Sequence, residues 1–284
     1  MPEVVTRVLD ESPSLGGLYV KAVLPPRGRP DTVPDLRLEL PGMASDLAHI
    51  AAYREVCGLP FHEVLPATYP HVLAFPLHLA LLTDADFPFA PMGCVHIRNR
   101  IEQRRPIDLA DTLDLAVWAE RLTPHRRGRT VTIVSEAAVA GEVVWRDETV
   151  LLRPGPGSET GLELASDPPV EPPSGPARWD LPGSLGREYA AVSGDRNPIH
   201  LYDLTAKAFG FRRHIAHGMW TKARCLAGLD SLLPRSYTVE VAFKKPIELP
   251  SQVTFGARQD DATIDFGVSG TTGTAHLVGR VTPG

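Results

Sequence analysis

Residues 189–211 read YAAVSGDRNPIHLYDLTAKAFGF, and they place an acid, an amide, a proline and a histidine close together. Asp195 and His200 lie on either side of Asn197-Pro198, and a proline restricts the residue before it to extended conformations. The stretch is therefore expected to be a bent loop that turns both side chains into one pocket. A carboxylate and an imidazole sharing one water molecule form an acid/base pair, because histidine titrates near neutral pH.

Regular elements are expected directly after this loop. Asp203 and Gly210 suit the two ends of a short helix. The apolar positions of HGMWTKARCLAGLDSLLP recur with helical spacing, and Pro234 ends the pattern. Strand-like runs follow at residues 237–243, 251–257, 262–269 and 274–281.

The first half of the chain repeats this order of elements. HIAAYREVCGLPF pairs Tyr53 with Tyr189 and Gly58 with Gly194, and VLAFPLHLALL matches the later apolar helix. RRPIDL likewise matches KKPIEL. Further strands are expected at residues 113–122, 129–140 and 142–152. The alignment sets Leu59 and Val64 against Asp195 and His200, so the acid/base pair occurs in one copy only.

A proline- and glycine-rich stretch separates the two halves. It predicts an interdomain linker over residues 154–176, because such a sequence continues neither a helix nor a central strand. The expected division is a non-catalytic repeat over residues 1–153 and a catalytic repeat over residues 177–284. In each repeat one apolar helix would be wrapped by an antiparallel sheet, which is an α+β fold.

IAHGMW, residues 215–220, is the second element with chemical potential. Gly218 would begin the apolar helix, where backbone N–H groups lack partners within the helix and carry partial positive charge. Glycine also lets a ligand approach closely. A thioester carbonyl placed there would find an oxyanion site, worth about 3 kcal/mol of barrier by analogy with other such sites.

Composition narrows the function classes. A net charge of −5 and a pI near 6.1 disfavour nucleic acid as a partner. The three cysteines, Cys57, Cys94 and Cys225, are too few and too far apart for a disulfide framework. The absence of such a framework favours a reducing, cytoplasmic location. No signal peptide is recognised, and the longest apolar run is too short for a membrane span.

SGDRNPIH followed by IAHGM resembles the signature of the MaoC-like (R)-specific enoyl-thioester hydratases and 3-hydroxyacyl-thioester dehydratases. TYPHVLAFPLHLALL, DFPFAPMGCVHIRN and RRPI are similar to the two-repeat, actinobacterial members. The resemblance implies a double hot-dog fold. It also implies a hydro-lyase that adds water reversibly and syn to a trans-2-enoyl thioester, giving the (3R)-hydroxyacyl thioester, in fatty-acid metabolism.

The resemblance also implies roles for particular residues. Asp195 and His200 would hold and activate the water and exchange the proton, and the Gly218 N–H would polarise the thioester carbonyl. Ser193, Asn197, His217 and Met219 are further substrate-binding candidates. The first repeat would supply the opposite wall and room for the acyl tail. The resemblance also implies that no metal or redox cofactor is needed. The segment that holds Asp195 and His200 offers no third and fourth ligand for a metal.

Several alternatives stay open at this point. The scaffold also suits an acyl-thioester hydrolase or a non-catalytic acyl-binding subunit. The sequence does not determine whether the acyl group is carried by coenzyme A or by acyl carrier protein. It also leaves open the length of the acyl chain, the direction of the reaction, and whether the protein is a monomer or a homodimer. The basic residues Arg212, Arg213, Lys222, Lys244 and Lys245 are candidates for contact with that carrier. His71, His78 and His96 have no predicted partner and are interpreted as surface or core histidines.

Overall fold

The computed structural model describes residues 4–23, 30–157 and 173–284. The first half contains β1 (Val5–Val8), α1 (Leu15–Val23), β2 (Leu36–Met43), α2 (Leu47–Cys57), α3 (Tyr69–Leu82), β3 (Val95–Gln103), β4 (Leu113–His125), β5 (Gly128–Val139) and β6 (Glu142–Pro154). The second half contains β7 (Ala177–Leu181), α4 (Leu185–Ser193), the 3₁₀ turn η1 (Pro198–His200), α5 (Asp203–Lys207), α6 (Gly218–Leu229), the 3₁₀ turn η2 (Asp230–Leu232), β8 (Tyr237–Phe243), β9 (Ser251–Asp260), β10 (Thr263–Gly270) and β11 (Ala275–Pro283).

A single 11-stranded sheet joins the two repeats, in the order β1-β2-β4-β5-β6-β3-β8-β11-β10-β9-β7. The two repeats have the same strand order outward from the central β3–β8 pair. The first repeat continues from β3 as β6-β5-β4-β2, and the second continues from β8 as β11-β10-β9-β7. At this joint Ile101 pairs antiparallel with Val239. Joining edge to edge leaves neither inner edge unpaired.

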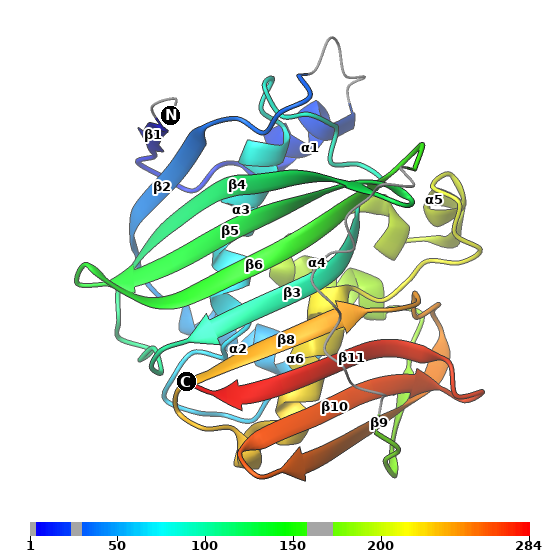
Figure 1. Ribbon diagram of the computed structural model, residues 1–284. Coiled ribbons are helices and arrows are strands. Elements are labelled where there is room, and N and C mark those ends of the chain that lie inside the picture. The colour runs from blue at the N-terminus through cyan, green and yellow to red at the C-terminus, as the bar shows by residue number, and fades with distance from the viewer. Residues whose placement is uncertain (1–3, 24–29, 158–172) are drawn as a thin grey trace.

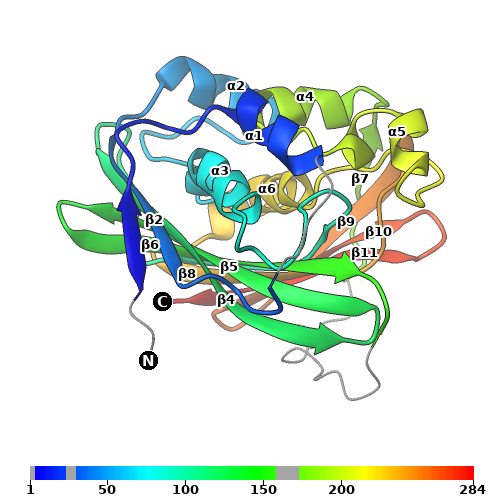
Figure 2. The same ribbon diagram turned by 90° about the horizontal axis from the view of Figure 1, so that it is seen from above.

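The helices lie on one face of the curved sheet. Figure 2 shows α3 and α6 side by side against the sheet, with α1, α2 and α4 in a layer above them. Figure 1 shows that the colours of the two repeats meet where β3 runs beside β8. Each central helix is thus wrapped by the sheet of its own repeat, which is the double hot-dog fold that the family resemblance implies.

Equivalent positions in the two repeats have equivalent backbone. Gly58 ends α2 with φ 64° and Gly194 ends α4 with φ 74°, a left-handed conformation that suits glycine. The rings of Tyr53 and Tyr189 meet with their centres 6.2 Å apart. The predicted strands that overlap β4, β5, β6, β8, β9, β10 and β11 are confirmed.

One detail of the expected alignment is wrong. Val64 forms an isolated bridge to Asp108, as Ile215 does to Glu248, so Val64 corresponds to Ile215 and not to His200. The first repeat joins these elements through residues 59–63, whereas the second uses residues 195–214. The segment with His200 is therefore an insertion that the first repeat lacks.

The start of α5 differs from the expectation, and the predicted linker stays untested. Tyr202, not Asp203, is the residue before α5, because the Asp203 carboxylate accepts hydrogen bonds from the backbone and ring of His214. Residues 158–172 of the predicted linker lie outside the described residues, so the domain division remains a prediction. Among the described residues, every helix is too short or too polar to cross a lipid bilayer.

Candidate active site

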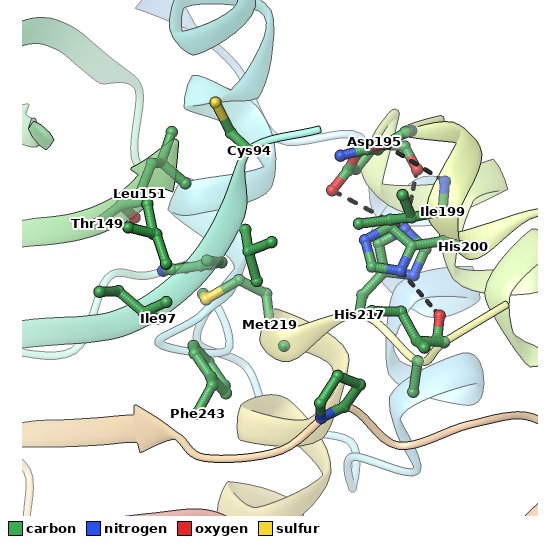
Figure 3. A pocket seen from close by; sticks show the side chains of 18 of the residues that line it. Cys94, Ile97, Thr149, Leu151, Asp195, Ile199, His200, His217, Met219 and Phe243 are labelled. Carbon is green, nitrogen blue, oxygen red and sulfur yellow. Dashed lines mark hydrogen bonds and ion pairs between the residues drawn. The ribbon is translucent and has the colours of Figure 1, made fainter. Parts of the chain in front are cut away.

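One cavity of about 390 Å³ lies between the two repeats. Figure 3 shows the side chains around it: Cys94, Ile97, Thr149 and Leu151 come from the first repeat, and Asp195, Ile199, His200, His217, Met219 and Phe243 come from the second. Thr149 and Leu151 lie on one side of the cavity and Asp195 and His200 on the other. The cavity therefore brings the predicted acid/base pair opposite the wall of the first repeat.

The turn after α4 holds Asp195 through short-range hydrogen bonds. The Asp195 N–H donates to Ser193 Oγ at 3.2 Å, and the Asn197 N–H donates to Asp195 Oδ1 at 3.1 Å. The Asn197 side chain in turn accepts from the Ile199 N–H at 3.5 Å. Ser193 and Asn197 both line the cavity, and these bonds show that they also shape the loop.

Burial and charge act in opposite directions on the Asp195 carboxyl. Burial raises its pKa, but the electrostatic interactions with His217 and His200 and the hydrogen bond from the Asn197 N–H outweigh burial, so the pKa of Asp195 lies below its usual value. Asp195 is therefore a carboxylate that accepts hydrogen bonds at neutral pH.

His200 ends the 3₁₀ turn η1 in a fixed orientation. Its Nδ1–H donates to the Ile215 carbonyl at 2.8 Å, so Nε2 is the nitrogen left for a substrate or water in the cavity that His200 lines. Burial lowers the pKa of His200, although the Asp195 charge acts in the opposite direction. The neutral imidazole, with an unprotonated Nε2, is thus favoured. Gly186 permits this approach, because a Cβ there would lie 1.9 Å from the His200 carbonyl oxygen.

His217 is the third member of the polar group. Its Nε2–H donates to the Asp195 backbone carbonyl at 3.0 Å, and its ring stacks on His200 with centres 3.7 Å apart. Burial lowers the pKa of His217 to about 3. It occupies the residue position before α6 but does not cap that helix with its side chain.

Asp195, His200 and His217 are also close enough to be considered as metal ligands. Their ligand atoms all lie within 4.8 Å of one another, so His217 adds a third group to the two in residues 195–200. Hydrogen bonds to backbone carbonyls already engage one ring nitrogen of each histidine. The arrangement is consistent with an acid/base site held by the backbone.

Gly218 is the first residue of α6, so its N–H has no acceptor within the helix. A Cβ at this position would lie 2.9 Å from the Phe243 ring, so a larger residue here would displace that ring from the helix start. Met219 follows and lines the cavity. Gly218, Met219 and the acid/base pair therefore border the same space.

Tyr19 contributes to the site although no sequence motif marks it. The Tyr19 hydroxyl donates to the Gly194 carbonyl at 2.9 Å and accepts from the Arg196 N–H at 2.6 Å. Helix α1 of the first repeat thus fixes the turn that carries Asp195. Nothing in the sequence around Tyr19 marks a contact with a residue so distant along the chain.

The basic residues near the site have different positions. Lys222 is fully buried, with Nζ donating to Asn99 Oδ1 at 2.5 Å and to the Val239 carbonyl at 3.1 Å, so its expected contact with the thioester carrier is wrong. Lys244 and Lys245 line the cavity. Arg212 is largely exposed beside Glu248.

Comparison with known proteins agrees with the fold. Residues 184–278 match the family model described as "MaoC like domain". The chain is 38% identical over 248 residues to 3-hydroxyacyl-thioester dehydratase X of Mycobacterium tuberculosis, covering 86% of this chain and 87% of that protein. The chain therefore belongs to the MaoC-like family.

Solved structures support the same assignment. A crystal structure of HtdX of Mycobacterium tuberculosis superposes with a TM-score of 0.78 at 36% identity, covering 87% of this chain and 99% of that one. A second protein of that organism, described as having a double hot-dog fold, gives a TM-score of 0.53 at 14% identity, covering 85% of this chain and 92% of that one. At that identity the likeness concerns the fold alone.

Proposed function

We propose that this protein is a hydro-lyase that interconverts trans-2-enoyl and (3R)-3-hydroxyacyl thioesters. The observation that carries the proposal is the hydrogen bond from His200 Nδ1 to the Ile215 carbonyl. It leaves Nε2 as an acceptor in a cavity that Asp195 and Gly218 also line. The dehydratase name of the 38% identical relative supports the same reaction.

In the hydration direction, one water molecule lies between the Asp195 carboxylate and His200 Nε2. Its oxygen forms the bond to C3 of the enoyl group while His200 Nε2 takes one of its protons. The electron pair of the C2–C3 double bond moves toward the thioester carbonyl, where the Gly218 N–H stabilises the negative charge that develops. The imidazolium then returns the proton to C2 on the same face, so one molecule of water is added in total.

Asp195 has a supporting role in this sequence. Its carboxylate accepts the second hydrogen bond of the water and stabilises the imidazolium while His200 holds the proton. These steps move a proton and a water molecule and are redox-neutral overall.

The two repeats would divide the work. The second repeat carries the acid/base pair, and the first supplies the opposite wall of the cavity with Phe75, Leu79 and Leu151. Lys244 and Lys245 follow β8 and line the same cavity. Their positive charge suits the phosphate groups of coenzyme A or of the acyl carrier protein arm.

The loss of enoyl-thioester absorbance on hydration tests the proposal. With crotonyl-CoA and longer enoyl-CoA substrates, Asp195→Asn and His200→Ala should each lower kcat by about 10²- to 10⁴-fold. His62→Ala is the matched control, because His62 is half exposed and pairs with Asp230 away from the cavity. Wild-type rates for His200→Ala, or release of free thiol without a hydroxyacyl product, would contradict the proposal.

A further inference from the structure

His214 is a buried histidine directly before Ile215, the residue whose carbonyl accepts the hydrogen bond from His200 Nδ1. Its side chain is 9% exposed, yet both of its ring nitrogens have partners. Nδ1 lies 2.5 Å from Asp203 Oδ1, and Nε2 lies 2.9 Å from the Gly183 carbonyl oxygen. The steps of hydration do not use this ring, so its two bonds require an explanation.

Both partners of the His214 ring can only accept hydrogen bonds. The Gly183 carbonyl has no proton to donate. The hydrogen bonds from the ring and backbone of His214 hold the pKa of the Asp203 carboxyl below its usual value, so Asp203 is a carboxylate. Nδ1 and Nε2 must therefore each carry a hydrogen, which makes the ring an imidazolium. A charged donor facing a carboxylate also agrees with the short distance of 2.5 Å.

The imidazolium joins three segments of the second repeat. Gly183 lies in the turn between β7 and α4, and Asp203 begins α5. His214 ends the inserted segment that also carries His200. The His214 N–H donates to Asp203 Oδ1 at 3.0 Å, and the His214 carbonyl accepts from the Leu249 N–H at 2.9 Å. The ring and the backbone of His214 thus close the inserted segment onto the rest of the repeat.

This closure determines the position of Ile215. The Ile215 N–H donates to the Ile199 carbonyl at 3.0 Å, and the Ile215 carbonyl accepts from His200 Nδ1 at 2.8 Å. A displacement of His214 would move Ile215, its neighbour along the chain, and with it the His200 ring. The bond to Ile215 also decides which nitrogen of His200 can take a proton, because it keeps the hydrogen of the neutral ring on Nδ1.

The charge of His214 acts on His200 as well. Burial is the main reason why the pKa of His200 is lowered, and the positive charge of His214 lowers it further. The Asp195 charge and the bond to Ile215 act in the opposite direction. A cation held close to the base therefore favours the neutral imidazole with which hydration begins.

Other titratable groups around these two histidines have weaker effects. They are the neutral His217, which stacks on His200, and Arg212, Arg213 and Glu248 at the surface. Solvent and salt screen exposed charges far more than buried ones. The surface groups therefore compensate little for a loss of the buried charge at His214.

We propose that His214 is a positioning residue of the hydration site, whose doubly hydrogen-bonded imidazolium fixes the Ile215 carbonyl and thereby the tautomer and orientation of His200. The proposal rests on the hydration reaction at Asp195 and His200. His214 acts through Ile215, which lines the cavity, and is not itself among the described residues of the lining.

His214→Gln tests this role, because glutamine is polar but uncharged. We expect kcat for hydration of crotonyl-CoA to fall by about 10²-fold, as a small misplacement of a catalytic group does, while KM stays close to the wild-type value. The acid limb of kcat/KM against pH should move to higher pH, because the charge that favours neutral His200 is gone. A side chain that only stabilises the fold would leave this limb in place.

His214→Arg is the conservative rescue. Arginine keeps the positive charge and offers several N–H donors to Asp203 and Gly183, so the acid limb should stay at its wild-type position and kcat should exceed that of His214→Gln. His62→Gln is the matched control, because it removes a histidine from another His–Asp pair, which joins His62 to Asp230 at 2.9 Å. It should keep the wild-type kcat and acid limb.

Nitrogen-15 NMR of the imidazole rings gives a measurement that does not depend on activity. In the wild type at neutral pH, both ring nitrogens of His214 should have the chemical shifts of protonated nitrogen. The signals are assigned by their loss in His214→Gln or, where that variant does not fold, in His214→Arg. Thermal unfolding shows that a variant is folded before its kinetics are compared.

Several results would overturn the proposal. They are wild-type kcat or an unmoved acid limb in folded His214→Gln, an acid limb in His214→Arg that matches His214→Gln, or an unprotonated nitrogen in the His214 ring. In each of these cases the wild type still hydrates its substrate, and the proposed function stands. If the wild type hydrates no enoyl thioester, the proposed function fails and the positioning role fails with it.

Discussion

The imidazole rings of His200 and His217 stack with centres 3.7 Å apart and an angle of 25° between their planes. Two rings at this distance do not both carry a positive charge, because each charge disfavours the other. Burial and the charge of His200 lower the pKa of His217 to about 3, so His217 remains neutral and holds the Asp195 backbone. His200 is left as the histidine of this pair that exchanges protons.

The pH dependence of hydration should report His200. The reaction needs its neutral imidazole, and burial lowers its pKa, so activity should persist below the ordinary histidine value of about 6.5 and fall only as pH drops through the lowered value. Asp195, whose pKa is also lowered, is ionised at neutral pH. The measurement is kcat/KM against pH, and an acid limb centred above the ordinary histidine value would contradict this assignment.

The packing of Gly186 against His200 predicts a selective loss of activity. In Gly186→Ala the new Cβ would meet the His200 carbonyl oxygen at 1.9 Å, so η1 must move and the ring of His200 with it. We expect kcat/KM to fall by about 10²-fold, as is typical of a misplacement of about 1 Å in a catalytic group. In the control Gly183→Ala, the new Cβ makes an ordinary 3.7 Å contact with Pro250, and activity should be retained. Equal activity in the two variants would show that the contact does not position His200.

Buried Lys222 should make the stability of the protein depend on alkaline pH. Burial lowers its pKa from the ordinary 10.5 to about 7 in the folded state, so between these values the unfolded chain binds a proton that the folded protein has released. The free energy of unfolding then rises with pH across this window, by at most about 1.4 kcal/mol per pH unit from this group. Denaturant unfolding at several pH values measures this slope.

Lys222→Met should lose that part of the slope, because it removes the titrating group from the buried position. Lys207→Met, at an exposed lysine of α5, is the control and should keep the wild-type slope. An unchanged slope in Lys222→Met would mean that Lys222 keeps its proton when buried.

Local patterns in the sequence were sufficient to predict the duplicated fold. The left-handed glycines Gly58 and Gly194 and the two apolar helices are short-range features, so they can be recognised without the structure. The length of the segment inserted before Ile215 does not follow from such patterns, because spacing alone does not show which residue resumes the sheet pairing. Spacing pairs Val64 with His200, whereas the isolated bridges pair it with Ile215.

The site was predicted only as far as its residues are neighbours along the chain. Asp195, His200 and Gly218 belong to one short region, and the structure places all three at one cavity. The contacts of Tyr19 with Gly194, and of His71 with Asp147, join residues far apart in the sequence. Such pairs depend on how α1, α3 and β6 pack, which no local pattern reports.

The hydroxyl of Tyr19 has a consequence for how the two halves can evolve. It bonds to the backbone on both sides of Asp195, so the half of the chain without the acid/base pair still helps to set the geometry of that pair. Gene duplication would ordinarily leave a spare copy free to change. Here α1 of the first repeat holds the turn that carries Asp195 in the second repeat. Selection for the reaction therefore also acts on α1.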